Sequence, residues 1–289
     1  MIQINSFAVI GGDRRQAEMA ESLVEDGCTV FAAAMEGAIF FNGVQKTSLQ
    51  QAVENSQAVI LPLPVSVDGK TLHAPLSDQR ILLDDGFAHL MSDKKVFCGM
   101  ASRLTRTSDL WNGAAVYDYS VQEEFAVRNS VPTAEGAIEI AMREFPGTIN
   151  GSRCLVAGYG RIGKTLCGML RGLGARVTAT ARKAKDLAWI EASGCRAFAT
   201  SQLWKTSGYD LIFNTIPQMV FDAHTLARCA GDALVIDLAS APGGVDFEAA
   251  KRLGIRAIQA LSLPGKCAPR AAGQIIKTTV YHMLEEEME

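Results

Sequence analysis

The residues with the clearest chemical potential form the glycine-rich run GYGRIG at positions 158–163. A strand-like apolar segment precedes this run, and helical spacing follows it over residues 164–173. In that setting the first glycine allows a tight turn, the second lets the backbone approach a pyrophosphate, and the third lets the helix pack on the strand. The helix N-terminus attracts negative charge. We therefore predict a dinucleotide site, rather than a glycine-rich turn without a ligand, with contacts from Gly158, Tyr159, Gly160, Arg161, Ile162 and Gly163.

The next strand, residues 176–180, indicates which dinucleotide is bound. NAD-specific sites of this kind carry an acidic residue about 20 residues after the glycines, which hydrogen-bonds the ribose 2′-hydroxyl. Here Thr180, a further predicted cofactor contact, ends the strand, Arg182 and Lys183 follow, and the first acid is Asp186. Because these cations attract a 2′-phosphate that a carboxylate would repel, the sequence favours NADP, with NAD as the other possibility. The alternative is that both cations are solvated loop residues.

Two further strands of the second half end in polar turns. The strand at 211–215 ends in the sequence NTIP, and the strand at 233–237 leads into DLASAPGG. Ligands of open α/β sheets bind at the carboxyl ends of the strands. These turns therefore predict the wall beside the nicotinamide, although either could be a plain strand-end turn. The predicted contacts are Asn214, Thr215, Ile216, Pro217, Leu238 and Ala239, with Ser240 as a candidate catalytic residue.

A weaker glycine motif, GGD at positions 11–13, follows a strand-like segment at residues 7–10. It lacks a third glycine at the right spacing, so we interpret it as a substrate-binding or structural loop rather than a second dinucleotide site. Asp13 has the position of an N-cap for a helix over residues 15–25. Arg14 and Arg15 are candidate anion-binding residues for a substrate, or ordinary surface arginines.

Three loops with proline and glycine, at residues 61–69, 129–136 and 263–269, look too specialised for simple connections. Such residues fix the backbone, which suits loops that hold a substrate against a cofactor. We expect the loops to face one cleft, although each alone could be a turn. Lys266, between a rigid LPG turn and the last helix, is the expected contact for a substrate carboxylate. The other candidates are Pro64, Ser66, Asn129, Pro264 and Gly265 for substrate binding, and Thr133 and Glu135, in the first turn of a helix, for catalytic polar contacts.

These candidates need a scaffold of alternating strands and helices. Short runs rich in Val, Ile and Phe alternate with helical spacing along the chain, the pattern of a parallel sheet covered by helices. The predicted class is α/β, with two Rossmann-like, doubly wound domains, of which the first is degenerate. The remaining predicted strands lie at residues 29–33, 58–63, 95–98, 115–117, 153–157, 196–199 and 257–260, which gives five strands in the first half and six in the second.

A linking helix sets the predicted domain boundary. Pro132 disfavours helix at Val131, so we expect the helix to begin there and to end at Pro146-Gly147. The chain then divides into a substrate-binding and catalytic domain with its linking helix, residues 1–147, and an NAD(P)-binding domain, residues 148–270. Residues 271–289 form a C-terminal helix that should pack back on the first domain, because its apolar face needs cover.

Composition excludes several classes of protein. The 289 residues are 48% hydrophobic and 20% charged with a net charge of −3 and no basic run, so we expect neither nucleic acid nor a membrane as partner. No apolar stretch approaches the roughly 18 residues of a spanning helix, and we expect a cytoplasmic protein. The seven cysteines are scattered singly, without metal-ligand spacing. The four histidines lie in no recognisable motif, which disfavours a 2-hydroxyacid dehydrogenase with its His–carboxylate pair.

Six motifs occur in order along nearly the whole chain: IGGDRRQ, NSVPTAEGAI, GYGRIGKTL, NTIP, DLASAPGGVDF and LPGKCAPRAAGQII. Together they resemble the family of dipicolinate synthase A subunits from spore-forming bacteria. The resemblance implies an NAD(P)-linked oxidoreductase subunit that forms pyridine-2,6-dicarboxylate from the product of dihydrodipicolinate synthase. It implies a small dicarboxylate substrate and, as partner, a flavoprotein-like B subunit of the synthase, and it is compatible with a homo-oligomer. The alternative is a dinucleotide-binding subunit without chemistry of its own that supports the flavoprotein.

Overall fold

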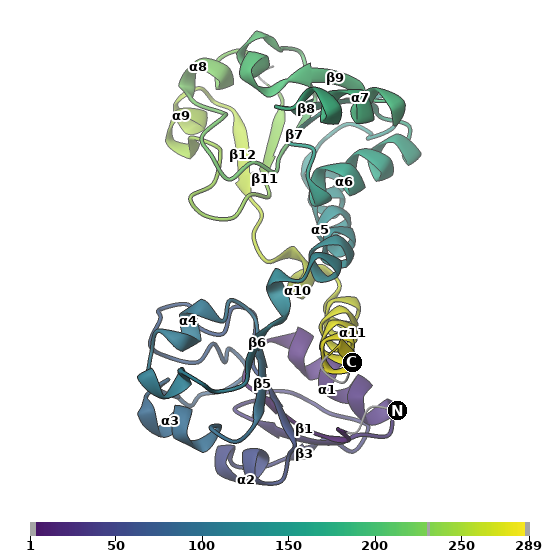
Figure 1. Ribbon diagram of the computed structural model, residues 1–289. Coiled ribbons are helices and arrows are strands. Elements are labelled where there is room, and N and C mark those ends of the chain that lie inside the picture. Colours follow the sequence, from purple (N-terminus) through teal and green to yellow (C-terminus); the bar gives the residue numbers. More distant parts are fainter. Residues whose placement is uncertain (1–3, 230–231, 287–289) are drawn as a thin grey trace. The chain divides into compact units, whose positions relative to one another are not determined.

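The computed structural model describes residues 4–229 and 232–286, which fall into two compact units. Unit 1 comprises Met1–Asn129 with Ala268–Glu289, and unit 2 comprises Ser130–Cys267. Each unit is built on a parallel sheet of six strands with helices around it (Figure 1). The predicted α/β class with two doubly wound domains is confirmed.

The sheet of unit 1 has the strand order β3-β2-β1-β4-β5-β6, in which every pair is parallel. This order is that of a complete doubly wound domain, with one strand more than the five expected from the sequence. The sixth strand, β3, is only two residues long and exposed, which leaves it no hydrophobic signal in the sequence. The strands are β1 Ser6–Ile10, β2 Thr29–Ala33, β3 Gln45–Lys46, β4 Ala58–Ile60, β5 Lys95–Cys98 and β6 Val116–Asp118; the helices are α1 Arg14–Glu25, α2 Leu49–Glu54, α3 Asp85–Leu90, α4 Ser102–Thr105, η1 Asp109–Trp111, η2 Tyr119–Val121 and α11 Pro269–Glu286.

The sheet of unit 2 has the equivalent order β9-β8-β7-β10-β11-β12, and its six strands are those predicted, within a residue or so at each end. Its strands read as nearly continuous apolar runs because both faces of a parallel sheet are buried. The strands are β7 Arg153–Ala157, β8 Arg176–Ala181, β9 Arg196–Ala199, β10 Leu211–Asn214, β11 Leu234–Asp237 and β12 Arg256–Gln259; the helices are α6 Arg161–Gly172, α7 Ala184–Ala192, η3 Thr200–Lys205, α8 Ala223–Leu226, α9 Phe247–Arg252 and α10 Leu263–Cys267.

Helix α5, Glu123–Glu144, runs through Pro132, so the expected helix start at that proline was wrong. Proline inside a helix removes one backbone hydrogen bond. Here the helix continues because apolar residues on both sides of the proline are buried in cores: Phe125 in that of unit 1, and Ala134 and Ala137 in that of unit 2. In sequence, the boundary between the two units lies within α5, between Asn129 and Ser130, rather than at residue 147.

Helix α11 packs against α1 in unit 1, as expected of the C-terminal helix (Figure 1). Ile276 and Val280 join Met19 in the core, and the Lys277 ammonium lies 2.6 Å from the Asp26 carboxylate. The described part of this helix begins two residues earlier than predicted and is followed to Glu286, since positions 287–289 lie outside the described residues.

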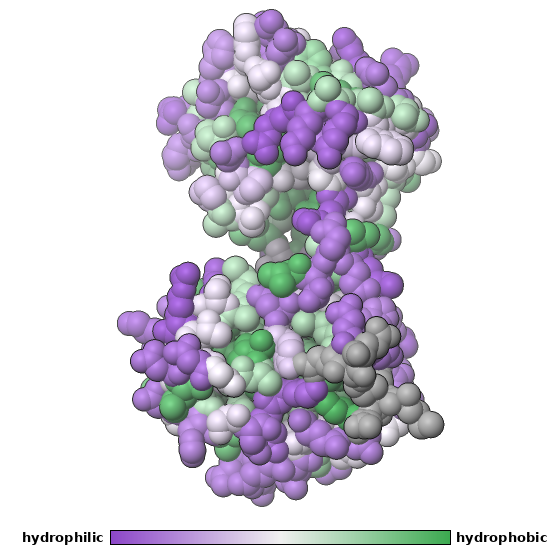
Figure 2. All heavy atoms as spheres, in the orientation of Figure 1, coloured by the Kyte–Doolittle hydropathy of each residue, from purple (hydrophilic) through white to green (hydrophobic). Residues whose placement is uncertain are grey.

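Hydrophilic side chains cover much of the visible face of each unit, with apolar side chains gathered in small areas (Figure 2). Within the described residues, every helix is too short or too polar to cross a membrane.

The close packing of α1 on α11 predicts that a side chain at position 273 destabilises the fold. A Cβ atom there would lie 2.5 Å from the Arg15 carbonyl oxygen and 2.9 Å from the Met19 nitrogen, so Gly273→Ala must push the helices apart. We expect urea unfolding followed by circular dichroism to show a loss of about 1–3 kcal/mol. The control is Gly168→Ala in α6, where nothing lies within 4 Å of the added carbon and a gain of up to about 1 kcal/mol is expected. Equal effects of the two changes would contradict the packing argument.

Candidate functional site

The loop between β7 and α6 has the backbone geometry that its three glycines predict. Gly158 adopts a φ of +98°, and a Cβ atom there would lie 2.4 Å from the Thr215 hydroxyl oxygen. A Cβ atom on Gly163 would lie 2.2 Å from the Gly158 carbonyl oxygen. The space where a Cβ atom of Gly160 would point is open, with no neighbouring atom of the described residues within 4 Å. Two glycines therefore let the chain fold back on itself, and the third leaves room for a ligand.

The N-terminus of α6 faces this open space without a side-chain cap. Gly160 is the N-cap residue and contributes no side-chain oxygen to the first-turn N–H groups. Uncapped N–H groups and the positive end of a helix dipole together make an anion site. The site therefore fits the pyrophosphate of a dinucleotide.

Two residues of the glycine run, Tyr159 and Ile162, hold the loop in place. The Tyr159 hydroxyl donates a hydrogen bond of 3.1 Å to the Ser193 hydroxyl, and the Lys164 ammonium lies 5.7 Å from the centroid of the Tyr159 ring. Ile162 packs against the core of unit 2, while Arg161 is exposed at the start of the helix. Tyr159 thereby ties the loop to the end of α7.

Thr180, predicted as a cofactor contact, is fully buried and hydrogen-bonds the backbone of the glycine loop. Its hydroxyl oxygen accepts a hydrogen bond from the Gly158 nitrogen at 3.2 Å and one from the Thr200 hydroxyl at 3.2 Å. Arg182 and Lys183 follow the end of β8 and are exposed. The two cations thus lie after the second strand of the nucleotide fold, where the ribose 2′ position is recognised in proteins of this fold.

The strand ends of β10 and β11 are joined by a buried polar pair. Asn214 donates from Nδ2 to Asp237 Oδ1 at 2.8 Å and to the Ile216 carbonyl at 3.0 Å, and its Oδ1 accepts from the Ile216 nitrogen. Asp237 accepts in turn from the Ala239 and Gly244 nitrogens, both at 3.1 Å. Asn214 and Asp237 are fully buried, and their hydrogen bonds to the backbone fix the two loops after β10 and β11. Asp237 opens the predicted DLASAPGG turn but was not among the predicted contact residues; its bond to Asn214 joins positions 23 residues apart in sequence.

The other predicted positions on these loops differ in their exposure. The Thr215 hydroxyl donates to the Ala157 carbonyl at 2.9 Å, next to the glycine run. Leu238 and Ala239 are buried, whereas Pro217 and Ser240 are exposed. The loops therefore present mainly backbone and small side chains at this edge of the sheet.

At the same edge of the sheet in unit 1, Asp13 and Arg15 form a fixed ion pair. Asp13 caps α1, as predicted, in a capping box with Gln16. Arg15 is 7% exposed; it lies 2.9 Å from the Asp13 carboxylate and donates at 2.5 Å to the Leu63 carbonyl. Burial alone would raise the pKa of Asp13, but the hydrogen bonds and charge of Arg15 outweigh it and lower that pKa. Arg15 is thus a buried structural cation, and Arg14 beside it is exposed.

His73 lies next to this ion pair and is a residue that sequence reasoning missed. Its carbonyl accepts from the Gly12 nitrogen at 2.8 Å, and its own nitrogen donates to the Val65 carbonyl at 2.9 Å. Burial lowers the pKa of the imidazole; the charge of Asp13 opposes this and that of Arg15 adds to it. Among the described residues, nothing hydrogen-bonds the ring, and the lowered pKa favours its neutral form. No local motif marks it, because its neighbours come from residues 12–15.

Pro64 and Ser66 lie in the loop after β4 that carries these groups. The bond between Leu63 and Pro64 is cis. The buried Ser66 hydroxyl donates to Asp68 Oδ1 at 3.1 Å and accepts from the Gly69 nitrogen, and the Ser66 carbonyl accepts from Arg103 at 2.7 Å. Hydrogen bonds from Thr71 and Lys70 hold the pKa of Asp68 well below its usual range. Ser66 therefore shapes the loop.

The expected rigid turn at residues 263–265 is instead the start of a short helix, α10, which also contains Lys266. This helix packs on α5: a Cβ atom on Gly136 would lie 2.8 Å from Cys267 Sγ, and that sulfur lies 3.3 Å from the Pro132 carbonyl. Lys266 itself is exposed. Thr133 and Glu135 lie in the middle of α5 rather than in its first turn, because the helix starts earlier. Thr133 is buried and Glu135 is exposed. Of the remaining candidates, Asn129 and Gly265 are half-buried and Pro264 is buried.

His282 has an acidic partner that its sequence context does not reveal. Its Nδ1 lies 2.9 Å from both carboxylate oxygens of Glu124. The pair joins α11 to the start of α5 in unit 1, 158 residues apart in sequence. It holds two helices together, a structural role.

Comparisons with known proteins agree with this arrangement. The family model for the N-terminal domain of the dipicolinate synthase A subunit matches residues 6–119, and that of the D-isomer specific 2-hydroxyacid dehydrogenase NAD binding domain matches residues 127–249. The chain is 31% identical over 284 residues to the A subunit of dipicolinate synthase from Bacillus subtilis, covering 97% of this chain and 96% of that one.

Solved structures give the same result. The crystal structure of the dipicolinate synthase A subunit from Bacillus halodurans superposes with a TM-score of 0.87 at 29% identity, covering 98% of this chain and 99% of that one. The corresponding chain from Bacillus subtilis gives 0.85 at 29% identity, with coverages of 99% and 97%. A transhydrogenase from Sinorhizobium meliloti, at 0.70 and 15% identity over 98% of this chain and 94% of that one, shares the fold.

The open space at Gly160 generates a prediction. We expect Gly160→Val to place its side chain where a pyrophosphate would lie, and to weaken NAD(P) binding at least tenfold in titration calorimetry. Because no described atom lies within 4 Å of the added Cβ, the melting temperature should change little. Gly172→Ala, at another open position in α6, is the control and should leave binding unchanged. Undiminished binding by Gly160→Val would place the dinucleotide elsewhere.

Proposed function

Since this chain belongs to the family of dipicolinate synthase A subunits, we propose that it oxidises a dihydropyridine dicarboxylate, the product of dihydrodipicolinate synthase, to pyridine-2,6-dicarboxylate. Loss of one hydride and one proton converts the dihydropyridine to the aromatic ring. The observation that carries the proposal is the glycine loop of unit 2, which combines a φ of +98° at Gly158 with open space at Gly160. The flavoprotein-like B subunit is the proposed partner.

The dinucleotide is held by unit 2 in this proposal. Gly158, Gly160 and the first turn of α6 bind the pyrophosphate, and the loops fixed by Asn214 and Asp237 line the nicotinamide side. When bound, NAD(P)⁺ supplies the hydride acceptor. The buried Asn214–Asp237 pair keeps both loops rigid, which preserves the geometry on which hydride transfer depends.

Arg182 and Lys183 make NADP the preferred form. Two exposed cations follow β8, and the acid that would bind a ribose 2′-hydroxyl is absent from its end. A guanidinium binds a phosphate with two hydrogen bonds and is always charged.

Unit 1 supplies the substrate contacts in this proposal. The substrate is a dianion, and Arg14 is an exposed cation at the start of α1, a helix end that itself favours negative charge. Arg15, neutralised by Asp13, positions the loop that carries Pro64 and Ser66 through its bond to the Leu63 carbonyl. Lys266 is a second candidate cation for a carboxylate, exposed on α10 of unit 2.

His73 is the proposed acceptor of the proton that aromatisation releases. Its ring is half-buried, it lies beside the ion pair of Asp13 and Arg15, and burial favours its neutral, basic form. A neutral imidazole can accept a proton, and histidine is the residue most often used as a general base.

The proposed function is tested with the purified chain, the product of dihydrodipicolinate synthase and NADP⁺, by the absorbance of reduced cofactor. We expect reduction by the chain itself, and a fall in kcat/KM of about 10²- to 10⁴-fold in His73→Asn. Because the neutral ring accepts the proton, the rate should fall as pH drops through the pKa of His73, which burial places below about 6.5. Dinucleotide affinity should not change.

His89→Asn, an exposed histidine of α3, is the matched control and should behave as the wild type. Full activity in His73→Asn would remove His73 from the reaction while leaving the oxidation intact. No reduction by the chain alone, but reduction once the flavoprotein is added, would favour the alternative of a dinucleotide-binding subunit without chemistry of its own.

Cofactor choice has a separate test. We expect Arg182→Ala combined with Lys183→Ala to weaken NADP binding by about 3 kcal/mol, because hydrogen bonds to charged groups are worth about 1.5–3 kcal/mol each and two exposed ones are lost. NAD affinity should be nearly unchanged. Lys185→Ala, an exposed lysine two residues further on, is the control. Equal losses for NADP and NAD would contradict the assignment of a 2′-phosphate to these cations.

A further inference from the structure

Three neighbouring strands of unit 2 each begin with an arginine: Arg153 in β7, Arg176 in β8 and Arg196 in β9. The sheet register pairs Arg153 directly with Arg176, and pairs Arg196 with Thr178, two residues after Arg176. Residues two apart on a strand share a face, and neighbouring strands lie about 4.8 Å apart. The fold therefore brings three guanidinium groups, well separated in sequence, to one face of the sheet at its amino end.

A fourth arginine, Arg171 from the last turn of α6, completes the group around a hollow of about 540 Å³. Thr178 and Tyr209 also line this four-arginine hollow. Gly194 and Gly208, both at positive φ, form part of its wall, and a Cβ atom on either glycine would lie within 3 Å of an arginine nitrogen. The two glycines therefore leave room for the guanidinium groups of Arg171 and Arg153.

The charge in the hollow is poorly balanced. Arg153 pairs with Asp210 at 3.2 Å, and Arg171 donates to the carbonyl of Ser193. Neither Arg176 nor Arg196 makes a side-chain hydrogen bond or ion pair with any part of the chain that the structure describes. Four guanidinium groups thus face one carboxylate, and like charges on paired residues destabilise a sheet. A bound anion would relieve that repulsion.

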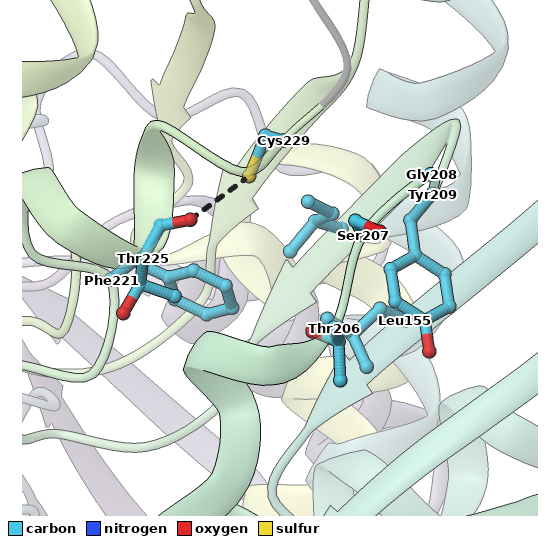
Figure 3. Close-up of a pocket in the computed structure, with 9 residues that line it drawn as sticks. Leu155, Thr206, Ser207, Gly208, Tyr209, Phe221, Thr225 and Cys229 are labelled. Atoms are coloured by element: carbon cyan, nitrogen blue, oxygen red, sulfur yellow. Dashed lines mark hydrogen bonds between the residues drawn. The ribbon is translucent and has the colours of Figure 1, made fainter.

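This hollow is separate from the dinucleotide loop, because the arginines begin the strands and the glycine loop follows their ends. Arg153 is the first and Ala157 the last residue of β7, a distance of about 13 Å along a strand. A small neighbouring cavity of about 10 Å³, between Tyr209 and Cys229, shares the wall of residues 207–209 with the hollow (Figure 3). It has room for about one water molecule and does not compete as a ligand site.

We propose that the four-arginine hollow binds a small organic anion that carries at least two carboxylate or phosphate groups. Its volume lies in the range of about 300–1,000 Å³ that is typical of small-molecule sites. Guanidinium groups bind carboxylate and phosphate with paired hydrogen bonds. The charges converge on one hollow instead of forming a stripe, and the chain as a whole carries a charge of −3, which argues against a nucleic acid.

Titration calorimetry of the full chain with citrate, and separately with pyrophosphate, tests this proposal. Saturating NADP is present throughout, so that neither probe can occupy the glycine loop. We expect each probe to bind, and Arg176→Ser combined with Arg196→Ser to weaken binding at least tenfold. The control, Lys251→Ser with Arg252→Ser, removes the same charge from exposed positions at the end of α9 and should leave affinity within twofold.

A second measurement uses the wild-type chain and does not depend on how the variants fold. Phenylglyoxal modifies accessible arginines, and mass spectrometry locates the modified peptides. Citrate, with NADP present, should protect Arg176 and Arg196 and leave Arg252 unprotected. Equal modification with and without citrate would overturn the proposal. So would binding of heparin or RNA at these arginines with no binding of citrate or pyrophosphate, which would indicate a macromolecular polyanion instead.

Discussion

The close approach of backbone to backbone at the β7–α6 turn is the constraint on which the nucleotide unit depends. Gly163 must come so near the Gly158 carbonyl that a Cβ atom would lie 2.2 Å from it, and this approach aims the N-terminus of α6 at the end of β7. Neighbouring groups serve the same turn: Thr180 accepts from the Gly158 nitrogen, and Thr215 donates to the Ala157 carbonyl. The buried polar groups at the strand ends therefore shape the backbone, and the backbone is what faces a ligand.

Unit 1 shows what happens when the same strand order lacks that turn. Its first loop also bends through two glycines of positive φ, Gly11 and Gly12. However, Gln16 folds back over the loop: its Oε1 accepts from the Asp13 nitrogen, and a Cβ atom on Gly12 would lie 2.5 Å from it. The carboxylate of Asp13 caps α1 and pairs with the buried Arg15. The first helix of unit 1 is thus capped by a side chain, whereas α6 in unit 2 begins at Gly160 without one.

Local patterns in the sequence were enough to predict the six strands of unit 2, five strands of unit 1, the glycine turn and the Asp13 cap. These features depend on residues within a few positions of one another, and apolar strands alternate regularly with amphipathic helices. The errors have the opposite character. Helix α5 continues through Pro132 because two cores bury its residues, a contribution that local propensity does not include. His73 belongs to no motif, and Asp237, although it opens the DLASAPGG turn, is tied to the neighbouring strand by Asn214, 23 residues away in sequence.

The net charge of −3 illustrates the same limit for electrostatics. Salt screens charges beyond about 8–10 Å, so a total charge says little about the field at one site. Arg153, Arg176 and Arg196 are about 20 residues apart and form no basic run, yet parallel pairing places their strands about 4.8 Å apart. Because parallel strands start at the same edge of the sheet, the first residue of one strand lies near the first residue of its neighbour. In a doubly wound sheet, a charged cluster is therefore predicted by comparing residues at equivalent positions of neighbouring strands, and not only by finding charged runs along the chain.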